Sequence, residues 1–485
     1  MTLLDPAAWS GRIFLDGWTV GGAGDASVVE PATGNELGRI GRAAPTDVAR
    51  ATERAQEAQR DWARTSYQAR AAILRRAGDL WKEHEPEIQG WIIRETGAIP
   101  PKAQLETWFA ASVCYDAAGL LSLPFGEVLP TNEPHLSMTR RVPIGVVGVI
   151  SPFNFPLILS IRAVAPALAL GNAVVLKPDP RTSVAGGVAL ARIFEEAGLP
   201  SGLFSVLPGG ADVGEALVTD PRVGLIAFTG STRAGRIVGA LAAKHLKRTH
   251  LELGGNSALI VLDDVDLEKA VSVGAFGSFM HQGQICMTTG RHLVARSIAD
   301  AYTAKLAEHA EHLPVGDPAT QQVALGPIID AHQRDHIHEL VTASVAAGAR
   351  LAAGGKYQDL FYRPTVLADV PESAPAWREE VFGPVAPVIA FDSIDEAVRL
   401  ASDTPYGLSL GILTADVMRG LEIADRIPSG IVHINDQTVG DEVTNPFGGV
   451  GETGGARLGG MAGNLETFTT TRWVTLRSRL PDYPF

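Results

Sequence analysis

From residue 143 onward the sequence alternates short runs of β-branched and apolar residues with segments of helical pattern. The predicted strands are 144–150, 173–176, 203–207 and 225–228, and the predicted helices between them are 183–197 and 211–218. Since a strand followed by a helix and another strand forms a βαβ unit, this alternation predicts a parallel sheet. Such sheets bind ligands at the carboxyl ends of their strands. We therefore expect an α/β protein with its site at that edge.

The flanking segments add a hairpin, further helices and a second α/β run. The hairpin is predicted at 13–20, with its turn at Asp16-Gly17. Helices are predicted over 46–64 with Thr46 as the N-cap, over 68–91 and over 102–121. A second α/β run extends from about residue 256 to 435, and the chain closes with a strand at 470–478. That strand can join a partner's sheet or dock on its own chain.

Charge and cysteine content limit the setting of the protein. The net charge is −13, whereas nucleic acid and anionic membranes are bound by basic surfaces, so we expect neither partner. The most apolar stretch, 142–176, is broken by prolines, asparagines and an arginine, and the N-terminus lacks a signal-peptide pattern. Two cysteines make no disulfide framework. We expect a cytoplasmic enzyme whose 485 residues form two or three domains.

Cys286 is the strongest candidate for a catalytic nucleophile. It follows Gln282-Gly-Gln-Ile and precedes Met-Thr-Thr, a setting that suggests a turn into a helix. Backbone amides at a helix start would lower the thiol pKa and could hold an oxyanion. Cys114 lies in an apolar helical pattern and is interpreted as a buried hydrophobic residue, the usual role of a lone cysteine.

Two polar residues could serve the same chemistry. Glu252, between two leucines and before Gly254-Gly255, has the setting of a partly buried carboxylate, and burial raises a carboxyl pKa toward that of a general base. A purely structural role, capping a helix or pairing with an arginine, is equally open. Asn154 follows a strand between Pro152 and Pro156. Its amide could donate to developing negative charge, although asparagine between prolines is often only a turn residue.

Two further segments suggest a nucleotide site. Lys177 closes a strand, where an ammonium group can hydrogen-bond a ribose. The segment 228–235 leads from a strand into a helix through Gly230-Ser231-Thr232, and such a turn offers amides and a hydroxyl to a phosphate. Neither segment is a G-x-G-x-x-G fingerprint or a Walker loop.

Taken together and in order, these segments resemble the aldehyde dehydrogenase superfamily over nearly the whole chain. The most specific elements are Leu251-Glu-Leu-Gly-Gly-Asn256 and Gly283-Gln-Ile-Cys286, whose Glu-to-Cys interval of 286 − 252 = 34 residues is that of the family. Glu379-Glu-Val-Phe-Gly-Pro384 and Asn445-Pro-Phe-Gly-Gly449 complete the resemblance.

The resemblance implies a Rossmann-variant cofactor domain at 1–125 and 143–253, an α/β catalytic domain at 254–446, and a small β oligomerisation arm with the C-terminal strand at 126–142 and 447–485. Cys286 would be the nucleophile, Glu252 the base that activates water, and Asn154 part of the oxyanion hole. The cofactor, NAD with NADP possible, would be held by Ile150, Ser151, Pro152, Lys177, Gly210, Gly230, Ser231, Gly235, Glu380 and Phe382. The resemblance implies no metal, and it implies a homodimer or a homotetramer.

The chain departs from the family pattern at three positions. Pro180 stands where many NAD-specific members carry a glutamate that binds the adenosine ribose, and Arg181 is next to it. Leu458 and Ala163 stand where many members have a glutamate and a lysine, so the proton route from Glu252 must differ and could use solvent or Glu452.

Within the superfamily, the segments 160–172, 177–182 and 432–438 are most similar to the benzaldehyde and vanillin dehydrogenases. A pocket for a flat ring would then draw on Phe155, Ile158, Arg162, Ile285, Met287 and Phe447. Two alternatives remain open: the same chemistry on an aliphatic aldehyde or semialdehyde, and a catalytically silent relative with a binding or structural role.

Overall fold

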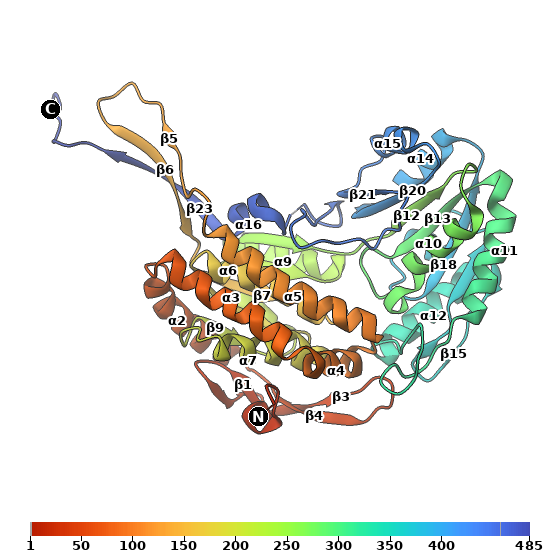
Figure 1. The fold of residues 1–485 in the computed structure, drawn as a ribbon, viewed down its shortest axis with the longest axis horizontal. Helices are drawn as coiled ribbons and strands as arrows, with labels where there is room; N and C mark the ends of the chain where they lie inside the picture. The colour runs from red at the N-terminus through yellow and green to blue at the C-terminus, as the bar shows by residue number, and fades with distance from the viewer. Residues whose placement is uncertain (1, 456) are drawn as a thin grey trace.

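The computed structural model describes residues 2–455 and 457–485, and its helices and strands form two α/β units and a projecting arm (Figure 1). The first unit contains a seven-stranded sheet in the order β11-β10-β7-β8-β9-β1-β2. Its strands are β1 (Arg12–Phe14), β2 (Trp18–Val20), β7 (Val146–Ile150), β8 (Ala173–Lys177), β9 (Phe204–Val206), β10 (Val223–Thr229) and β11 (Arg248–Glu252). The five strands from β7 to β11 pair in parallel, so the predicted βαβ arrangement and the predicted hairpin at β1 and β2 are confirmed.

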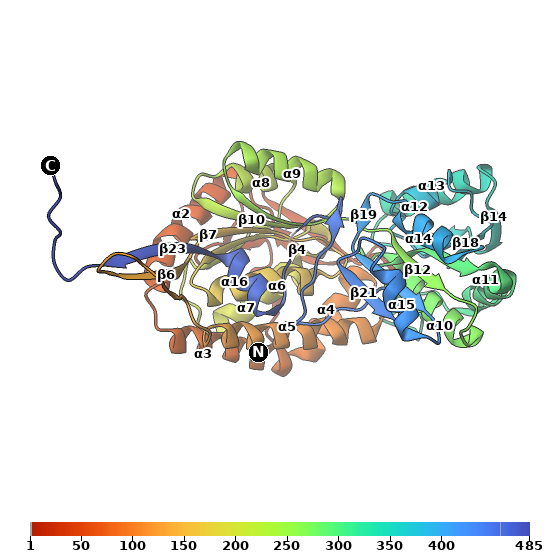
Figure 2. The same ribbon diagram turned by 90° about the horizontal axis from the view of Figure 1, so that it is seen from above.

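Helices cover both faces of this sheet, as Figure 2 shows. The helices of this unit are α1 (Pro6–Trp9), α2 (Pro45–Trp62), α3 (Tyr67–Glu83), α4 (Glu85–Thr96), α5 (Pro100–Leu120), α6 (Pro156–Ala169), α7 (Ala189–Glu196), α8 (Ala211–Thr219) and α9 (Thr232–Lys244). A π-helical turn at Val184–Val188 precedes α7, and β3 (Asp25–Val29) pairs with β4 (Glu36–Gly41). The chain lays β8 and β9 on one side of β7 and β10 on the other, so the strand order reverses at β7, where α/β sheets hold ligands.

The second unit is built on another seven-stranded sheet, in the order β14-β17-β18-β13-β12-β20-β21. Its strands are β12 (Ser257–Val261), β13 (Thr289–Ala295), β14 (Arg350–Ala353), β17 (Thr365–Ala368), β18 (Val385–Phe391), β20 (Ser409–Leu413) and β21 (Ile431–Ile434). Its helices are α10 (Leu267–Phe279), α11 (Arg296–His312), α12 (Ala331–Ala346), α13 (Pro375–Arg378), α14 (Ile394–Ser402) and α15 (Val417–Ala424). Two small ladders join β15 (Tyr357–Gln358) to β16 (Phe361–Tyr362) and β19 (Tyr406–Gly407) to β22 (Val450–Gly451).

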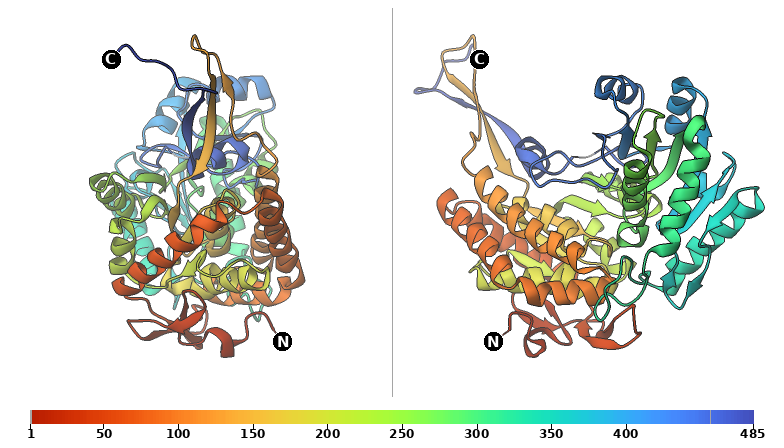
Figure 3. Two further views of the ribbon diagram at one scale, coloured as in Figure 1. Left: turned by 90° about the vertical axis from the view of Figure 1, so that its left-hand side faces the viewer. Right: turned by 45° about the vertical axis from the view of Figure 1, so that its right-hand side comes forward.

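The C-terminal strand docks on its own chain. β23 (Thr469–Leu476) pairs antiparallel with β6 (Leu136–Pro143), which also pairs with β5 (Val128–Leu129), and the three strands project from the first unit (Figures 1 and 3). The preceding helix, α16 (Gly460–Phe468), packs on the first unit, since Leu458 and Phe468 belong to its buried core. Within the described ranges, no helix is long and apolar enough to cross a membrane.

Two helix predictions were wrong: one helix begins at a different residue, and the other is interrupted. The first helix begins at Pro45, and its N-cap residue is Ala44 rather than Thr46, because the Asp47 carboxylate reaches back to accept from the Ala44 amide. The segment 68–91 is two helices that meet at His84. Pro86 explains the break, since proline has no N–H to donate to a preceding turn and is tolerated only at a helix start.

Candidate active site

A mainly apolar pocket of about 570 Å³ lies between the two units. It is lined by residues of α5, α6, the loop before β13 and the segment after β21. These residues are Leu105, Phe109, Asn154, Phe155, Ile158, Leu159, Arg162, Met280, Ile285, Cys286, Met287, Val439, Asp441 and Phe447. The structure thus brings together the predicted nucleophile, the predicted oxyanion donor and all six residues predicted for the substrate pocket.

Cys286 lies in a strained loop rather than at a helix start, so the predicted turn into a helix is wrong. Thr288 closes a turn on the Ile285 carbonyl, and the chain then enters β13, as the β-branched and apolar residues from Thr289 favour. The three residues His281, Gln282 and Gly283 have φ values of +47°, +55° and +65°. Such a run is costly for side chains other than glycine, so the surrounding structure must hold it.

The loop's own side chains anchor it to the backbone of both units. The Gln282 amide donates to the carbonyls of Gly97 (3.0 Å) and Pro327 (2.8 Å), and the side-chain oxygen of Gln284 accepts from the Ile329 amide (3.1 Å). A Cβ on Gly283 would lie 2.1 Å from the Gly383 carbonyl oxygen, so only glycine fits there.

Glu252 ends β11 beside the nucleophile loop. A Cβ on Gly255, three residues further on, would lie 2.2 Å from the Cys286 carbonyl oxygen, which shows how closely the two segments approach. Glu252 is buried, and in the described part of the chain neither carboxylate oxygen has a hydrogen-bond partner. Burial raises its pKa well above the ordinary value, and the nearby Arg162 opposes that shift. The structural role left open from the sequence, helix capping or pairing with arginine, has no hydrogen bond to support it.

Asn154 follows β7 and is held from both sides. Its amide nitrogen donates to the Gln284 carbonyl (2.9 Å), and its own carbonyl accepts from the ammonium group of Lys102 (2.8 Å). Lys102 also pairs with Glu106, and Glu106 accepts from the amides of Leu157 and Ile158 at the start of α6. Sequence patterns gave no sign of this buried ion pair, because Lys102 and Glu106 look like solvated helix positions.

The Cys286 thiol lies in a setting that favours its neutral form. Burial raises its pKa, and the carboxylates of Glu380, Glu252 and Asp441 raise it further, while Arg162 alone lowers it. The amide-rich helix terminus expected from the sequence is not what surrounds this thiol. Forming a thiolate therefore requires a base, and Glu252, whose pKa burial raises well above its ordinary value, is a candidate.

Aromatic rings and one cation form the pocket wall. The Arg162 guanidinium lies 5.0 Å from the centre of the Phe109 ring and 4.5 Å from that of Phe447, and it forms an ion pair with Asp441. Its Nη1 nitrogen is buried without a hydrogen-bond partner among the described residues. Sequence analysis missed Phe109 and Asp441, because helix α5 and the loop after β21 join the pocket only in three dimensions.

The predicted cofactor residues gather at the carboxyl ends of the first sheet. Ile150 pairs with both Lys177 and Phe228, and Ser151, followed by Pro152, hydrogen-bonds Ser160 of α6. The Lys177 residue is buried, and within the described ranges its ammonium group hydrogen-bonds only the Pro178 carbonyl, at 3.5 Å.

The surrounding loops are also those predicted. Gly210 caps α8, and the Ser231 hydroxyl caps α9 by accepting from the Ala234 amide. Packing explains why residue 235 is a glycine, since a Cβ there would lie 2.2 Å from the Leu253 side chain. The remaining predicted contacts come from the second unit: Glu380 accepts from the Gly255 amide, and the Phe382 ring lies 5.9 Å from that of Phe153. Burial raises the pKa of Glu380 to about 7.

Arg181, the residue that follows Pro180, does not have an unpaired charge. The Arg181 guanidinium pairs with Asp179 (2.8 Å) and with Asp330 of the second unit (2.6 Å), and it lies 4.3 Å from the Phe153 ring centre. Its charge therefore ties the two units together.

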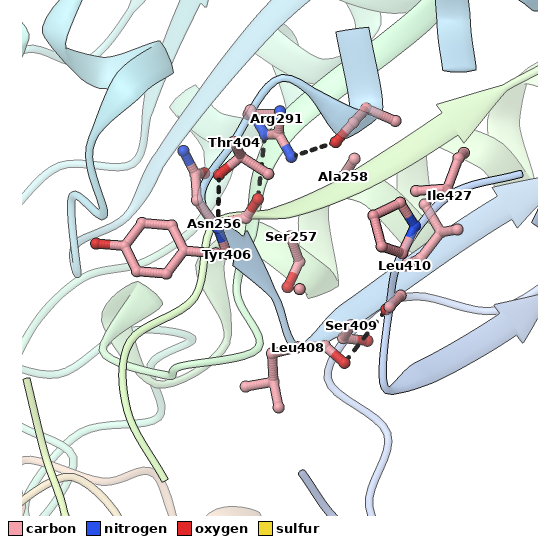
Figure 4. Close-up of a pocket in the computed structure, with 14 residues that line it drawn as sticks. Asn256, Ser257, Ala258, Arg291, Thr404, Tyr406, Leu408, Ser409, Leu410 and Ile427 are labelled. Carbon is pink, nitrogen blue, oxygen red and sulfur yellow. Dashed lines mark hydrogen bonds between the residues drawn. The ribbon is translucent and has the colours of Figure 1, made fainter. Parts of the chain in front are cut away.

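A second pocket, shown in Figure 4, lies beside the loop that follows Glu252. There the buried Arg291 donates to the carbonyls of Asn256, Leu400 and Ala401. These bonds fix the start of β12, and the pocket contains neither Cys286 nor Glu252. Within the described residues, no group of three or more His, Cys, Asp or Glu side chains is arranged to hold a metal.

Comparison with known proteins agrees with this geometry. The aldehyde dehydrogenase family model matches residues 18–474. The chain is 66% identical to a vanillin dehydrogenase of Amycolatopsis sp. over 100% of both chains, and 49% identical to a benzaldehyde dehydrogenase [NAD(+)] of Pseudomonas putida over 98% of both. The crystal structure of a salicylaldehyde dehydrogenase from Pseudomonas putida G7, complexed with salicylaldehyde, superposes with a TM-score of 0.94 at 35% identity, covering 98% of this chain and 99% of that one. The chain belongs to the aldehyde dehydrogenase family.

Proposed function

We propose that this protein oxidises an aromatic aldehyde to the carboxylate, using NAD, through a covalent thioester on Cys286. The observation that carries the proposal is the pocket itself, in which Cys286 lies among the rings of Phe109, Phe155 and Phe447. A flat aromatic substrate fits such walls because stacked and edge-to-face rings attract one another. The names of the similar vanillin, benzaldehyde and salicylaldehyde dehydrogenases support the same substrate class.

The residues at the sheet edge fit a dinucleotide. Lys177 is a buried cation with one long hydrogen bond among the described residues, and hydroxyl groups of a ribose would satisfy it. The start of α9, with Gly230 and Ser231, directs backbone amides to the position where a pyrophosphate would lie. Glu380 and Phe382 would hold the second ribose from the other unit. When bound there, NAD would supply a hydride acceptor for the substrate carbon.

The first half of the reaction belongs to Cys286 and Asn154. Glu252 takes the thiol proton, and the thiolate attacks the aldehyde carbon to form a thiohemiacetal. The Asn154 side chain can donate to the resulting oxyanion, and the ion pair of Lys102 and Glu106 holds its backbone in place. After oxidation of that carbon, the acyl group remains on Cys286 as a thioester.

The second half belongs to Glu252. After the thiol proton has passed from Glu252 to solvent, the carboxylate removes a proton from a water molecule, whose oxygen forms a bond to the acyl carbon while the C–S bond breaks. The acid leaves and the Cys286 sulfur is regenerated. The apolar lining keeps other water away from the thioester until this step.

Arg162 would add selectivity within the aromatic class. Because its Nη1 nitrogen is buried without a partner and the residue lines the pocket, we propose that it donates to an oxygen substituent on the substrate ring. Such a contact would favour hydroxylated benzaldehydes over unsubstituted benzaldehyde.

The test is the initial rate of NADH formation at ~340 nm with benzaldehyde, vanillin, a short aliphatic aldehyde and a semialdehyde. Wild type should turn over the aromatic substrates fastest, and Cys286→Ala should form no NADH. Cys114→Ala serves as the matched control and should retain activity, because that thiol is buried in the first core. Faster turnover of the aliphatic substrates would replace the aromatic proposal, and cofactor binding without any turnover would indicate a silent relative.

We propose further that the protein is a cytoplasmic homodimer or homotetramer assembled through the arm. The arm exposes Val128 (74%), Trp473 (68%) and Leu476 (54%), an apolar surface that a monomer rarely leaves in water. Two free cysteines fit a reducing compartment. Light scattering tests the assembly: a fully active monomer would refute it.

A further inference from the structure

His250 and Glu252 form a buried pair at the end of β11. Because side chains alternate along a strand, residues two apart point to the same face. The His250 Nε2 atom lies 3.7 Å from the Glu252 Oε1 atom, and both residues are buried, at 2% and 5% exposed. A change in either side-chain torsion would bring the two atoms within hydrogen-bond distance.

Neither group has another hydrogen-bond partner in the described ranges. Both carboxylate oxygens of Glu252 and the Nε2 atom of His250 are buried and unsatisfied. Leaving such groups unpaired is costly, and most buried polar atoms in proteins are bonded. A donor and an acceptor that lack partners and face each other are the simplest way to satisfy both.

The cavity around the pair also contains Arg162 and Thr229, but Arg162 pairs with Asp441, and among the described residues neither side chain forms a hydrogen bond with Glu252. It encloses about 330 Å³ and is lined mainly by apolar residues, including Ala163 and Leu458 at the positions where a proton relay was expected from the resemblance. Glu452, the alternative suggested by the sequence, forms an ion pair with the exposed Arg236 instead.

The charges near the pair keep His250 neutral. Arg162 of α6, Arg457 and Asp441 of the C-terminal segment, and the Cys286 thiol are the charged and titratable groups that influence Glu252 and its surroundings. Burial lowers the pKa of His250 to about 3, and the two arginines add to that shift. A neutral imidazole donates from one nitrogen only, so the Nε2–H tautomer suits this contact.

We propose that neutral His250 donates a hydrogen bond to the Glu252 carboxylate and is the positioning residue that sets the basicity of the general base. The proposal rests on the proposed function, since it assigns the environment of the same base. His250 touches neither substrate nor cofactor and acts through Glu252. Its N–H stabilises the charged form of Glu252, so that the carboxylate is available to deprotonate water at neutral pH.

The experiment compares His250→Leu, which removes the donor, with His250→Gln, which keeps an N–H at similar reach. In His250→Leu the acid limb of the kcat profile should move up by about one to two pH units, the strength of a hydrogen bond to a charged group. His250→Gln should recover most of that shift. Leu458→Met, a volume-conserving change in the same cavity, is the matched control and should leave the profile in place.

A second readout does not need turnover. The infrared C=O stretch of protonated Glu252, identified by its loss in Glu252→Gln, should persist to higher pH in His250→Leu than in wild type. Unchanged infrared titration in His250→Leu, or an equal shift in His250→Gln, would overturn the proposal. A wild type that oxidises no aldehyde would refute the proposed function instead, and the infrared titration would still decide whether His250 supports Glu252.

Discussion

The buried ion pair of Lys102 and Glu106 should be one of the most sensitive structural elements of the site. Both side chains are fully buried, and together they link α5 to the Asn154 loop and to the start of α6. Removing one member of a buried pair leaves an uncompensated charge and costs about 3–5 kcal/mol. The two possible deletions differ, however, in what they leave behind.

Glu106→Leu is the more damaging change. It leaves the Lys102 ammonium with the Asn154 carbonyl and the face of the Phe155 ring, and it removes the acceptor of the Leu157 and Ile158 amides. We expect a loss of about 3–5 kcal/mol in the free energy of unfolding. Lys102→Met should cost less, about 2–3 kcal/mol, because Glu106 keeps both amide donors. The double variant should lose less than the sum of the two.

Urea unfolding monitored by circular dichroism and fluorescence measures these differences, and kcat reports on Asn154. Glu57→Leu is the matched control, since its partner Arg54 is 47% exposed and the pair lies on the surface of α2. It should change stability by no more than about 0.5 kcal/mol. The reasoning fails if Glu106→Leu costs no more than Glu57→Leu, or if the two buried substitutions are additive.

Three further predictions concern the catalytic loop, the base and the cofactor. Gly283→Ala should destabilise the fold by about 1–3 kcal/mol and reduce activity. The added Cβ would collide with the Gly383 carbonyl, and the φ of +65° at this position disfavours alanine. Thermal unfolding and rate assays measure both effects. Glu252→Gln should slow the first-turnover burst of NADH and abolish steady-state turnover, because the same carboxylate takes the thiol proton and activates water; stopped-flow absorbance distinguishes the two steps. In wild type, kcat should fall as pH decreases, at a pH above the ordinary carboxyl range, since burial raises the pKa of Glu252. NAD should be preferred to NADP, because the Arg181 guanidinium is already paired with Asp179 and Asp330. Asp179→Asn should weaken that preference, because it leaves more of the Arg181 charge free to attract the extra phosphate of NADP. The kcat/KM values for the two cofactors measure this change.

The family and the parallel strands β7 to β10 could be predicted from the sequence alone, which also singled out Cys286, Glu252 and Asn154 as candidate catalytic residues. Local signals suffice for these features. Strand and turn residues alternate with a clear period, and the motifs around Glu252 and Cys286 each occupy a few consecutive positions. The π-helical turn at 184–188 and the helix break at His84 are boundary details that periodicity resolves poorly.

The surroundings of those residues could not be predicted, because they depend on how distant segments pack. Phe109, Asp441 and Arg162 belong to three distant segments, and their meeting in one pocket depends on how the units pack. The same holds for Lys102, which resembles a solvated lysine in sequence and lies behind Asn154 in the fold. The pKa of the Cys286 thiol was expected to be lowered, and the structure raises it. A thiol pKa depends on burial and on charges from elsewhere in the chain, and these effects have no local sequence pattern.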